Sequence, residues 1–229
     1  MISWIIAAAV VFILLAIYPG ELSWVRSGGH RWLYDRAAQH YNDKWLRHDY
    51  KDFDQQIARA AALAADLHSP PAVLDLACGT GRATLSAYRT LGEQADYTAV
   101  DFSTGMLAQF STDNGALPQW LRDNVKTECN ELGDWLAHNE RRYELVLLME
   151  ASEFIPGNRA LTSQLGRTVR AGGQLVMTRP AGFWWLLFPG RGQSRKVIAQ
   201  RLREAGFSEP DFIPWRQRYE LVTAHRQAD

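Results

Sequence analysis

The sequence has little cysteine and no excess of either charge. Its 229 residues include two cysteines, Cys78 and Cys129, too few for a disulfide framework, which is typical of a reducing compartment. Lysine and arginine total 25, and so do aspartate and glutamate, so the formal net charge is zero. Nucleic-acid binding needs clustered cationic side chains that neutralise phosphates. The balanced charge therefore argues against a nucleic-acid partner.

The histidines lack the spacing of metal ligands. They stand at positions 30, 40, 48, 68, 138 and 225, and no two of them are separated as the ligands of a zinc site are. We predict no metal site.

The first 20 residues contain no charged side chain, and over Ile2–Tyr18 nothing is more polar than Ser3. At about 1.5 Å per residue, a helix over this run would reach roughly 26 Å, at the short end of what crosses a hydrocarbon core. We predict a hydrophobic membrane-anchor helix over residues 1–20.

The alternatives to an anchor are a cleaved signal peptide and a buried hydrophobic helix. No lysine or arginine precedes the run, and residues 17–20 form a poor cleavage site. The first basic residues follow the run at Arg26, Arg31 and Arg36, so the positive-inside tendency places the rest of the chain in the cytoplasm.

Beyond residue 49 the chain alternates short apolar strands with helices. This alternation predicts an α/β domain, with a mostly parallel sheet covered on both faces. A final strand pair without an intervening helix predicts an antiparallel strand at the edge of the sheet. The expected strands are 72–77, 96–101, 125–129, 145–149, 174–178, 207–215 and 219–225, and the expected helices are 52–67, 82–90, 103–110, 158–170 and 194–205.

A buried strand, a glycine turn and a helix start follow one another over Val73–Leu85. Gly79 and Gly81 let the backbone approach a ligand closely, and the helix start presents free N–H groups. About 20 residues later Asp101 ends the next strand, where a carboxylate can accept both hydrogen bonds of a ribose diol. These features indicate a nucleoside-containing cofactor.

Two residues argue against a nicotinamide dinucleotide. The dinucleotide fingerprint needs Gly or Ala at its sixth position, where this chain has Thr84. Asp75, four residues before Gly79, suits a cationic ligand better than a pyrophosphate.

The string Val73–Arg82 (VLDLACGTGR), together with Tyr97–Ser103, resembles the class I S-adenosylmethionine-dependent methyltransferases over roughly residues 50–226. The resemblance implies a Rossmann-like fold, a seven-stranded mostly parallel sheet with one antiparallel strand, and S-adenosylmethionine as cofactor. Glu128 stands where the family usually has Asp. The cofactor-binding residues that the resemblance implies are Asp75, Ala77, Gly79, Thr80, Gly81, Asp101, Phe102, Met106, Glu128, Cys129 and Met149.

The segment Tyr34–Tyr41 is similar to the stretch that often closes over the cofactor in this family. We therefore divide the chain into an anchor helix (1–20), a juxtamembrane connector and cofactor-lid segment (21–49), and a methyltransferase domain (50–229).

Two further segments bear on the methyl acceptor. Glu150 and Glu153 follow the fourth expected strand and are candidates for a catalytic base, which is needed only if the acceptor must lose a proton. Phe183–Pro189 places six large apolar residues in a row on a connection. It predicts an acceptor-site wall or a membrane-dipping loop, with Arg191, Arg195 and Lys196 facing lipid phosphates. A helix start folded into the core is the alternative.

The expected function is methyl transfer from S-adenosylmethionine to a small, lipophilic acceptor at the membrane. The first alternative is a catalytically silent domain at the membrane that binds S-adenosylmethionine or a partner protein. The second is a dinucleotide-dependent oxidoreductase.

Overall fold

The computed structural model describes residues 27–42, 50–112, 117–155, 158–182, 194–216 and 218–228. The expected anchor over residues 1–20 and the segment Phe183–Pro189 lie outside the described residues. Within the described ranges, no helix is long and apolar enough to cross a membrane.

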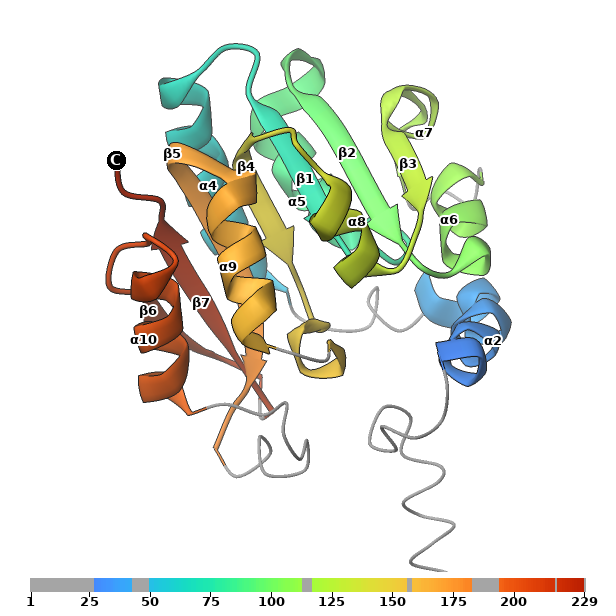
Figure 1. Cartoon of the computed structure of the whole chain (residues 1–229). Helices are drawn as coiled ribbons and strands as arrows, with labels where there is room; N and C mark the ends of the chain where they lie inside the picture. The colour runs from blue at the N-terminus through green and yellow to red at the C-terminus, as the bar shows by residue number, and fades with distance from the viewer. Residues whose placement is uncertain are drawn as a thin grey trace, which may run out of the picture.

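The core of the fold is a seven-stranded sheet in the order β3-β2-β1-β4-β5-β7-β6 (Figure 1). β7 pairs antiparallel with both β5 and β6, and every other pairing is parallel. The predicted sheet with one antiparallel strand is confirmed. The strands are β1 (Ala72–Leu76), β2 (Asp96–Asp101), β3 (Lys126–Cys129), β4 (Tyr143–Leu148), β5 (Val169–Pro180), β6 (Asp211–Trp215) and β7 (Tyr219–His225).

The predicted position of the antiparallel strand, at the edge of the sheet, is wrong. β7 is inserted between β5 and β6, so β6 forms the edge and runs in the same direction as the other five strands. A hairpin can place either of its strands outermost. Here the apolar second strand, of which Leu221 and Val222 are fully buried, takes the inner position.

Helices cover both faces of the sheet, and each face has its own hydrophobic core. The α4 and α5 side contributes Phe53, Ile57 and Leu85 to one core, and the α8, α9 and α10 side contributes Leu161 and Leu202 to the other (Figure 1). The helices are α2 (Ser27–Ala37), α4 (Lys51–Leu67), α5 (Arg82–Leu91), α6 (Thr104–Ser111), α7 (Gln119–Asn124), α8 (Leu132–His138), α9 (Asn158–Thr168) and α10 (Arg195–Glu204), with 3-10 turns η1 (Ala38–His40), η2 (Gly92–Gln94) and η3 (Ser152–Phe154).

The start of β5 also differs from the prediction. The strand begins at Val169 and runs through Gly172, instead of following a helix that extends to residue 170. Its pairing with β4 shifts between Tyr143↔Val169 and Leu145↔Gln174, so five steps on β5 match two on β4. Gly172 absorbs this irregularity with a φ of +80°.

The last predicted strand pair is shorter than expected on its first strand. Phe207 forms only an isolated bridge to Arg226, and the continuous strand begins at Asp211. Two short helices, α7 and α8, were not expected from the sequence, because neither contains two full turns of apolar periodicity.

A buried carboxylate joins the three central strands at their amino ends. Glu144 is fully buried, its Oε2 accepts a 2.7 Å hydrogen bond from the Ala72 N–H, and its Oε1 pairs with Arg170 Nε at 2.5 Å. This contact ties the starts of β1, β4 and β5 together. The register that follows places the carboxyl ends of these strands side by side.

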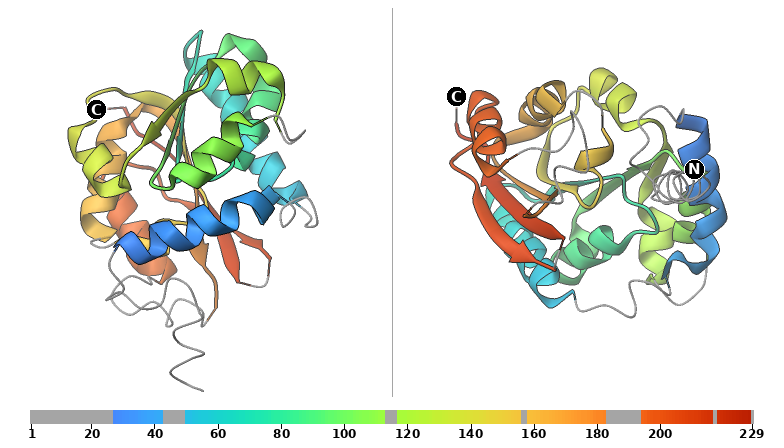
Figure 2. Two further views of the ribbon diagram at one scale, coloured as in Figure 1. Left: turned by 90° about the vertical axis from the view of Figure 1, so that its right-hand side faces the viewer. Right: turned by 90° about the horizontal axis from the view of Figure 1, so that it is seen from below.

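α2 lies at the edge where the parallel strands end, beside α6 (Figures 1 and 2). In open α/β sheets ligands bind at this edge. The segment Tyr34–Tyr41 therefore lies next to the residues that the sequence assigned to a site.

Candidate active site at the carboxyl edge of the sheet

Asp75 in β1 holds the start of α5. Its Oδ2 accepts hydrogen bonds from the Thr84 N–H at 2.9 Å and from the Thr84 hydroxyl at 2.6 Å. The Asp75 side chain is 1% exposed, and its Oδ1 has no hydrogen-bond partner among the described residues. Burial raises the pKa of this carboxyl to about 7. Thr84, which departs from the dinucleotide pattern, is thus the partner that orients Asp75.

The loop after β1 adopts left-handed backbone conformations three times. Ala77, Gly79 and Gly81 have φ values of +54°, +55° and +92°. A Cβ on Gly81 would lie 2.6 Å from the Phe110 ring, so only glycine fits there. Cys78 is buried in the core, and burial raises the pKa of its thiol well above the ordinary value, which agrees with a packing role.

Asp101 joins this loop to the end of β2. Its Oδ2 accepts a 2.8 Å hydrogen bond from the Gly79 N–H, and its Oδ1 accepts one of the same length from the Ser103 N–H. Burial raises the pKa of the carboxyl, although these backbone bonds oppose the shift. Each oxygen can still accept another hydrogen bond, because a carboxylate oxygen offers two acceptor positions.

The N-terminal segment is fastened to the start of α6 by Asp35. Its Oδ1 accepts hydrogen bonds from the Ser103 hydroxyl at 2.6 Å and from the Gly105 N–H at 2.8 Å. On one side of Asp35, Tyr34 meets Phe102 edge to face with ring centroids 5.5 Å apart. Further along, Tyr41 Cε1 lies 3.9 Å from where a Cβ on Gly79 would stand. Tyr34 and Tyr41 therefore flank the two strand ends that carry the predicted cofactor residues.

Two of the remaining predicted cofactor residues lie at the end of β3. The Glu128 carboxylate pairs with Lys126 at 2.6 Å and accepts a 2.6 Å hydrogen bond from Trp135 Nε1. These contacts, led by Lys126, lower its pKa. Cys129 is exposed, and its Sγ lies 3.6 Å from the Phe102 carbonyl oxygen.

Met106 and Met149 differ in exposure. Met106 is 1% exposed, and its N–H donates to Ser103 Oγ, which caps the start of α6. Met149 is partly buried and packs against the core on the α4 side.

Glu150, one of the two candidate bases, is engaged in an ion pair. Its Oε1 lies 2.8 Å from Arg216 Nη1, and the Arg216 guanidinium lies 5.2 Å above the Tyr50 ring. The Glu150 N–H donates a 2.5 Å hydrogen bond to the Thr178 hydroxyl, and its φ is +50°. A residue other than glycine in this left-handed region has a strained backbone, and such strain is common at functional sites.

Glu153, the other candidate base, is 1% exposed. Its Oε1 accepts a 2.7 Å hydrogen bond from the Tyr219 hydroxyl at the start of β7. Burial raises the pKa of Glu153 to about 7, and burial together with the Glu153 charge raises the pKa of Tyr219 far above its usual range.

Tyr34 connects the two groups of acidic residues. Its pKa is raised to about 12, chiefly by burial and then by the charges of Glu153, Asp101 and Glu150, in that order. The pKa of Tyr41 is also raised, chiefly by burial, and the charges of Glu150 and Asp101 add to the shift. Carboxylates from β2 and from the segment after β4 thus act on the same tyrosines.

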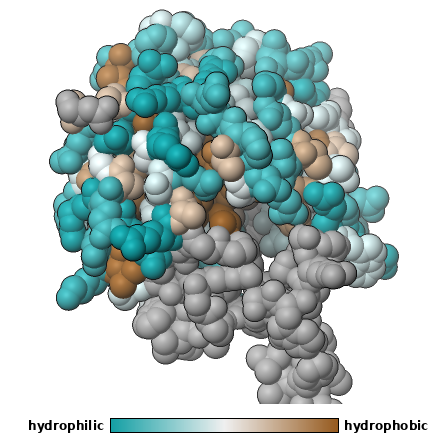
Figure 3. Space-filling view, in the orientation of Figure 1, coloured by the Kyte–Doolittle hydropathy of each residue, from teal (hydrophilic) through white to brown (hydrophobic). Residues whose placement is uncertain are grey.

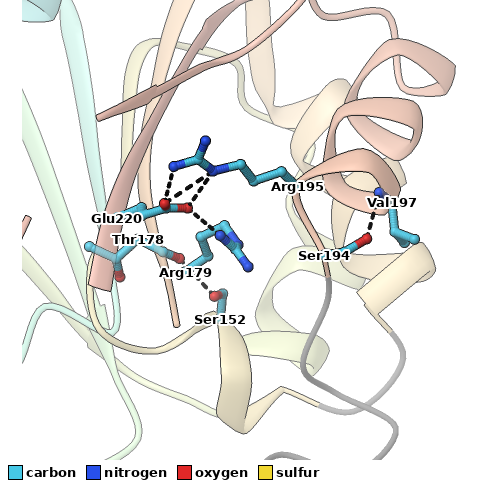
Figure 4. Close-up of polar contacts among 7 residues, drawn as sticks. All are labelled: Ser152, Thr178, Arg179, Ser194, Arg195, Val197 and Glu220. Atoms are coloured by element: carbon cyan, nitrogen blue, oxygen red, sulfur yellow. Dashed lines mark hydrogen bonds and ion pairs between the residues drawn. The ribbon is translucent and has the colours of Figure 1, made fainter. Parts of the chain in front are cut away.

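An ion triad, in which Glu220 and Arg179 are buried and Arg195 is half exposed, lies on the α10 side of this edge (Figure 4). The Glu220 carboxylate accepts hydrogen bonds from Arg179 Nη1 and from Arg195, whose Nε is 3.0 Å from Oε2. Arg179 precedes the connection that contains Phe183–Pro189, and Arg195 follows it. One carboxylate therefore holds both ends of that connection against β7.

Several of these residues were not singled out from the sequence. Tyr219 was expected only as the first residue of a strand, and its partner Glu153 stands 66 positions away. Asp35 belongs to the predicted lid segment, but its bonds to Ser103 and Gly105 span 68 and 70 positions. No local pattern reports such long-range pairs.

Comparison with known proteins gives a family match over the central part of the chain. Residues 73–173 match the family model described as "Methyltransferase domain". The chain is 29% identical to the biotin biosynthesis bifunctional protein BioCD of Bordetella avium (strain 197N) over 146 residues, and these residues make up 63% of this chain. The match spans only 28% of that bifunctional protein.

Solved structures agree on the fold. An O-methyltransferase family protein from Burkholderia thailandensis matches with a TM-score of 0.65 and 18% identity, over 87% of this chain and 63% of that one. The N-methyltransferase NodS from Bradyrhizobium japonicum WM9, solved with S-adenosyl-L-homocysteine, matches with a TM-score of 0.63 and 12% identity, over 86% of this chain and 98% of that one.

The same fold also occurs in a protein named for another reaction. The [4+2]-cyclase SpnF matches with a TM-score of 0.64 and 16% identity, over 87% of this chain and 95% of that one. At such identities the likeness concerns the fold, so the reaction has to be argued from the site.

Proposed function

We propose that this chain is a class I S-adenosylmethionine-dependent methyltransferase and that it moves a methyl group from S-adenosylmethionine to a small, lipophilic acceptor at a membrane surface. One observation carries the proposal. The glycine loop, with Asp75 and Asp101, lies beside Glu150 and Glu153. Tyr34 is close enough to both groups that the charges of Glu153, Asp101 and Glu150 raise its pKa.

The residues at the ends of β1 and β2 suit this cofactor. Asp75 Oδ1 is a buried acceptor without a partner among the described residues, and an ammonium group would satisfy it. Asp101 keeps acceptor positions on both oxygens for the ribose hydroxyls. Gly79, which is half-buried, leaves its backbone accessible to a ligand, and Gly81 lets the loop pack closely against Phe110. Contacts of Ala77, Thr80, Phe102, Met106, Glu128, Cys129 and Met149 with the cofactor remain predictions.

When bound, S-adenosylmethionine supplies an activated methyl group, so the protein's main task is to orient the acceptor. We assign that task to the residues after β4 and at the start of β7. Tyr34 and Tyr41, fastened to α6 through Asp35, would cover the reacting groups and exclude water, as expected of a cofactor lid.

A membrane location is supported chiefly by the sequence. The run Ile2–Tyr18 is free of charge, and Phe183–Pro189 is almost entirely large and apolar. Among the described residues, Trp32 on α2 is 63% exposed, and such a ring suits the interface between lipid and water. On the face drawn in Figure 3 the described surface is mostly hydrophilic, so on that face it offers no broad apolar contact of its own.

The test is incubation of the full-length protein with labelled S-adenosylmethionine and a membrane lipid extract, followed by mass analysis. We expect labelled products that are soluble in organic solvent. Titration with S-adenosylhomocysteine and with NAD in parallel separates the alternatives. Binding of S-adenosylhomocysteine without transfer to any fraction indicates a silent binding domain, and binding of NAD alone indicates an oxidoreductase.

A further inference from the structure

One oxygen of the buried Glu153 carboxylate is already held, and the other is not. Oε1 accepts the 2.7 Å hydrogen bond from Tyr219. Oε2 lies 3.4 Å from the Ser152 hydroxyl, which has a single hydrogen and is 2.8 Å from the Thr178 carbonyl oxygen. The shorter contact takes that hydrogen, because hydrogen bonds weaken with distance. Oε2 is thus left able to accept a proton.

Glu150, three residues earlier, is arranged differently. Its charge is balanced by Arg216, and about 30% of its side chain is exposed. Glu153 forms no ion pair with any lysine or arginine in the part of the chain that the structure describes. A carboxylate paired with a guanidinium is a weak base, whereas a buried carboxylate that is held by neutral donors, chiefly the Tyr219 hydroxyl, is a stronger one.

We propose that Glu153 is the general base of the methyl transfer and that Tyr219 is the residue that positions it. The acceptor class follows, because a base is needed only for a nucleophile that carries a proton. The acceptor is therefore a hydroxyl or ammonium group rather than a carboxylate, a thioether or an unprotonated amine. This inference rests on the proposed function.

The step balances without any further reagent. The acceptor's proton passes to Oε2 of Glu153, and the acceptor's lone pair forms the new bond to the methyl carbon. The bond from that carbon to the sulfonium sulfur breaks, and its electron pair stays on sulfur. Glu153 returns its proton to solvent before the next turnover.

The surroundings of Glu153 set the pH range in which it acts. The titratable groups that face it are Tyr219 on β7, Tyr34 on α2 and Glu150 after β4, whose partner is Arg216. Burial raises the pKa of Glu153 to about 7, and the Tyr219 hydroxyl opposes this shift because it stabilises the ionised form. Near neutral pH a large share of the carboxylate is ready to take a proton, and it remains a good base.

Three variants of the full-length protein test the proposal: Glu153→Gln, Tyr219→Phe, and the control Glu209→Gln. Glu209 is an exposed glutamate just before the start of β6, whereas Tyr219 pairs with Trp215 at the other end of that strand. Transfer from labelled S-adenosylmethionine to the lipid extract is followed from about pH 5 to about pH 9. Affinity for S-adenosylhomocysteine is measured by calorimetry, and infrared difference spectra of the cofactor-free protein report carboxyl protonation.

We expect Glu153→Gln to lower turnover by about 100-fold or more, while affinity for S-adenosylhomocysteine stays within about twofold of wild type. In Tyr219→Phe, the rise of turnover with pH moves to higher pH, because the pKa of Glu153 increases when its hydrogen bond is lost. Two carboxyls, Asp75 and Glu153, titrate near neutral pH, so the infrared spectra of wild type and Glu153→Gln are subtracted. The difference contains the Glu153 signal alone, because the Asp75 signal is common to both proteins. Glu209→Gln behaves as wild type in all three measurements.

Each contrary result has a defined meaning. Wild-type turnover in Glu153→Gln, or a Glu153 carboxyl that is ionised down to about pH 5, overturns the base assignment. An unshifted pH profile in Tyr219→Phe overturns the positioning role. If wild type binds S-adenosylhomocysteine but labels nothing, the proposed function itself fails, and the base assignment fails with it.

Discussion

The Asp101 carboxylate and the Gly79 amide are joined by a 2.8 Å hydrogen bond that links the end of β2 to the loop after β1. The same carboxylate accepts from Ser103, the residue that caps α6 and that Asp35 holds from the N-terminal segment. Asp101 is therefore connected to the glycine loop, to α6 and, through Ser103, to the predicted lid.

Replacing Asp101 tests the cofactor site directly. We expect Asp101→Ala to weaken binding of S-adenosylhomocysteine by about tenfold or more, because hydrogen bonds to a charged group contribute about 1.5–3 kcal/mol. Asp96→Ala is the matched control, since Asp96 begins the same strand and forms a largely exposed ion pair with Arg141. Calorimetry measures both. Equal affinities in the two variants would count against the site.

Asp75 should make stability depend on pH. Its pKa is raised from 3.8 to about 7 in the folded protein, so the native state binds the proton more tightly than the unfolded state does. This contribution is fully present below about pH 4 and is lost as the pH rises to about 7, which amounts to about 4 kcal/mol. In urea titrations, wild type should lose stability over this range relative to Asp75→Asn. Parallel pH profiles for the two proteins would refute the shift.

Gly166 allows α9 to approach the end of α10. A Cβ at this position would lie 2.3 Å from the Ala205 carbonyl oxygen, which is backbone and cannot move aside alone. We expect Gly166→Ala to lower the free energy of unfolding by about 1–3 kcal/mol through overpacking. A Cβ on Gly133, in α8, would meet nothing within 4 Å. Gly133→Ala should therefore be neutral or stabilising by up to about 1 kcal/mol in the same denaturation experiment.

Glu220 should contribute strongly to stability, because it is buried with the Arg179 guanidinium. Glu220→Gln leaves that cation without its carboxylate, at an expected cost of about 3 kcal/mol. Glu204→Gln removes the exposed pair with Arg159 and should change the free energy of unfolding far less, because water and salt screen that pair. Chemical denaturation distinguishes the two. If they lose the same small amount, the triad is not a structural clamp.

Membrane attachment is tested by removing residues 2–20. We expect the full-length protein to sediment with phospholipid vesicles, even at high salt, because the net charge is zero and the leader is apolar. The shortened protein should stay in the supernatant or bind far more weakly. A full-length protein that is wholly soluble, with its leader intact, would contradict the anchor.

The sequence predicted those parts of the fold that depend on local patterns. The apolar strands β1 and β2 and the helices α4 and α5 lie within one residue of their expected ends. Ser103 caps α6 because a short side chain with an acceptor oxygen stands just before a helix, which is a signal that neighbouring residues contain.

Features that depend on distant residues could not be predicted in the same way. The position of β7 inside the sheet depends on which strand of a hairpin pairs with β5. The difference between Glu150 and Glu153 depends on Arg216 and Tyr219, both 66 residues away. Two acids three residues apart in sequence thus acquire different partners and different burial from contacts that only the folded chain creates.

The outer strands β3 and β6 limit how this protein can associate with copies of itself. β3 has four residues, among them the ion-paired Lys126 and Glu128, and β6 has five with Pro214 near its end. Charged side chains, short length and a proline without an N–H all disfavour the addition of a foreign strand to an exposed sheet edge. Among the described residues, both edges of the sheet are therefore protected against intermolecular β-sheet growth, and self-assembly through this part of the chain would use its helices or loops.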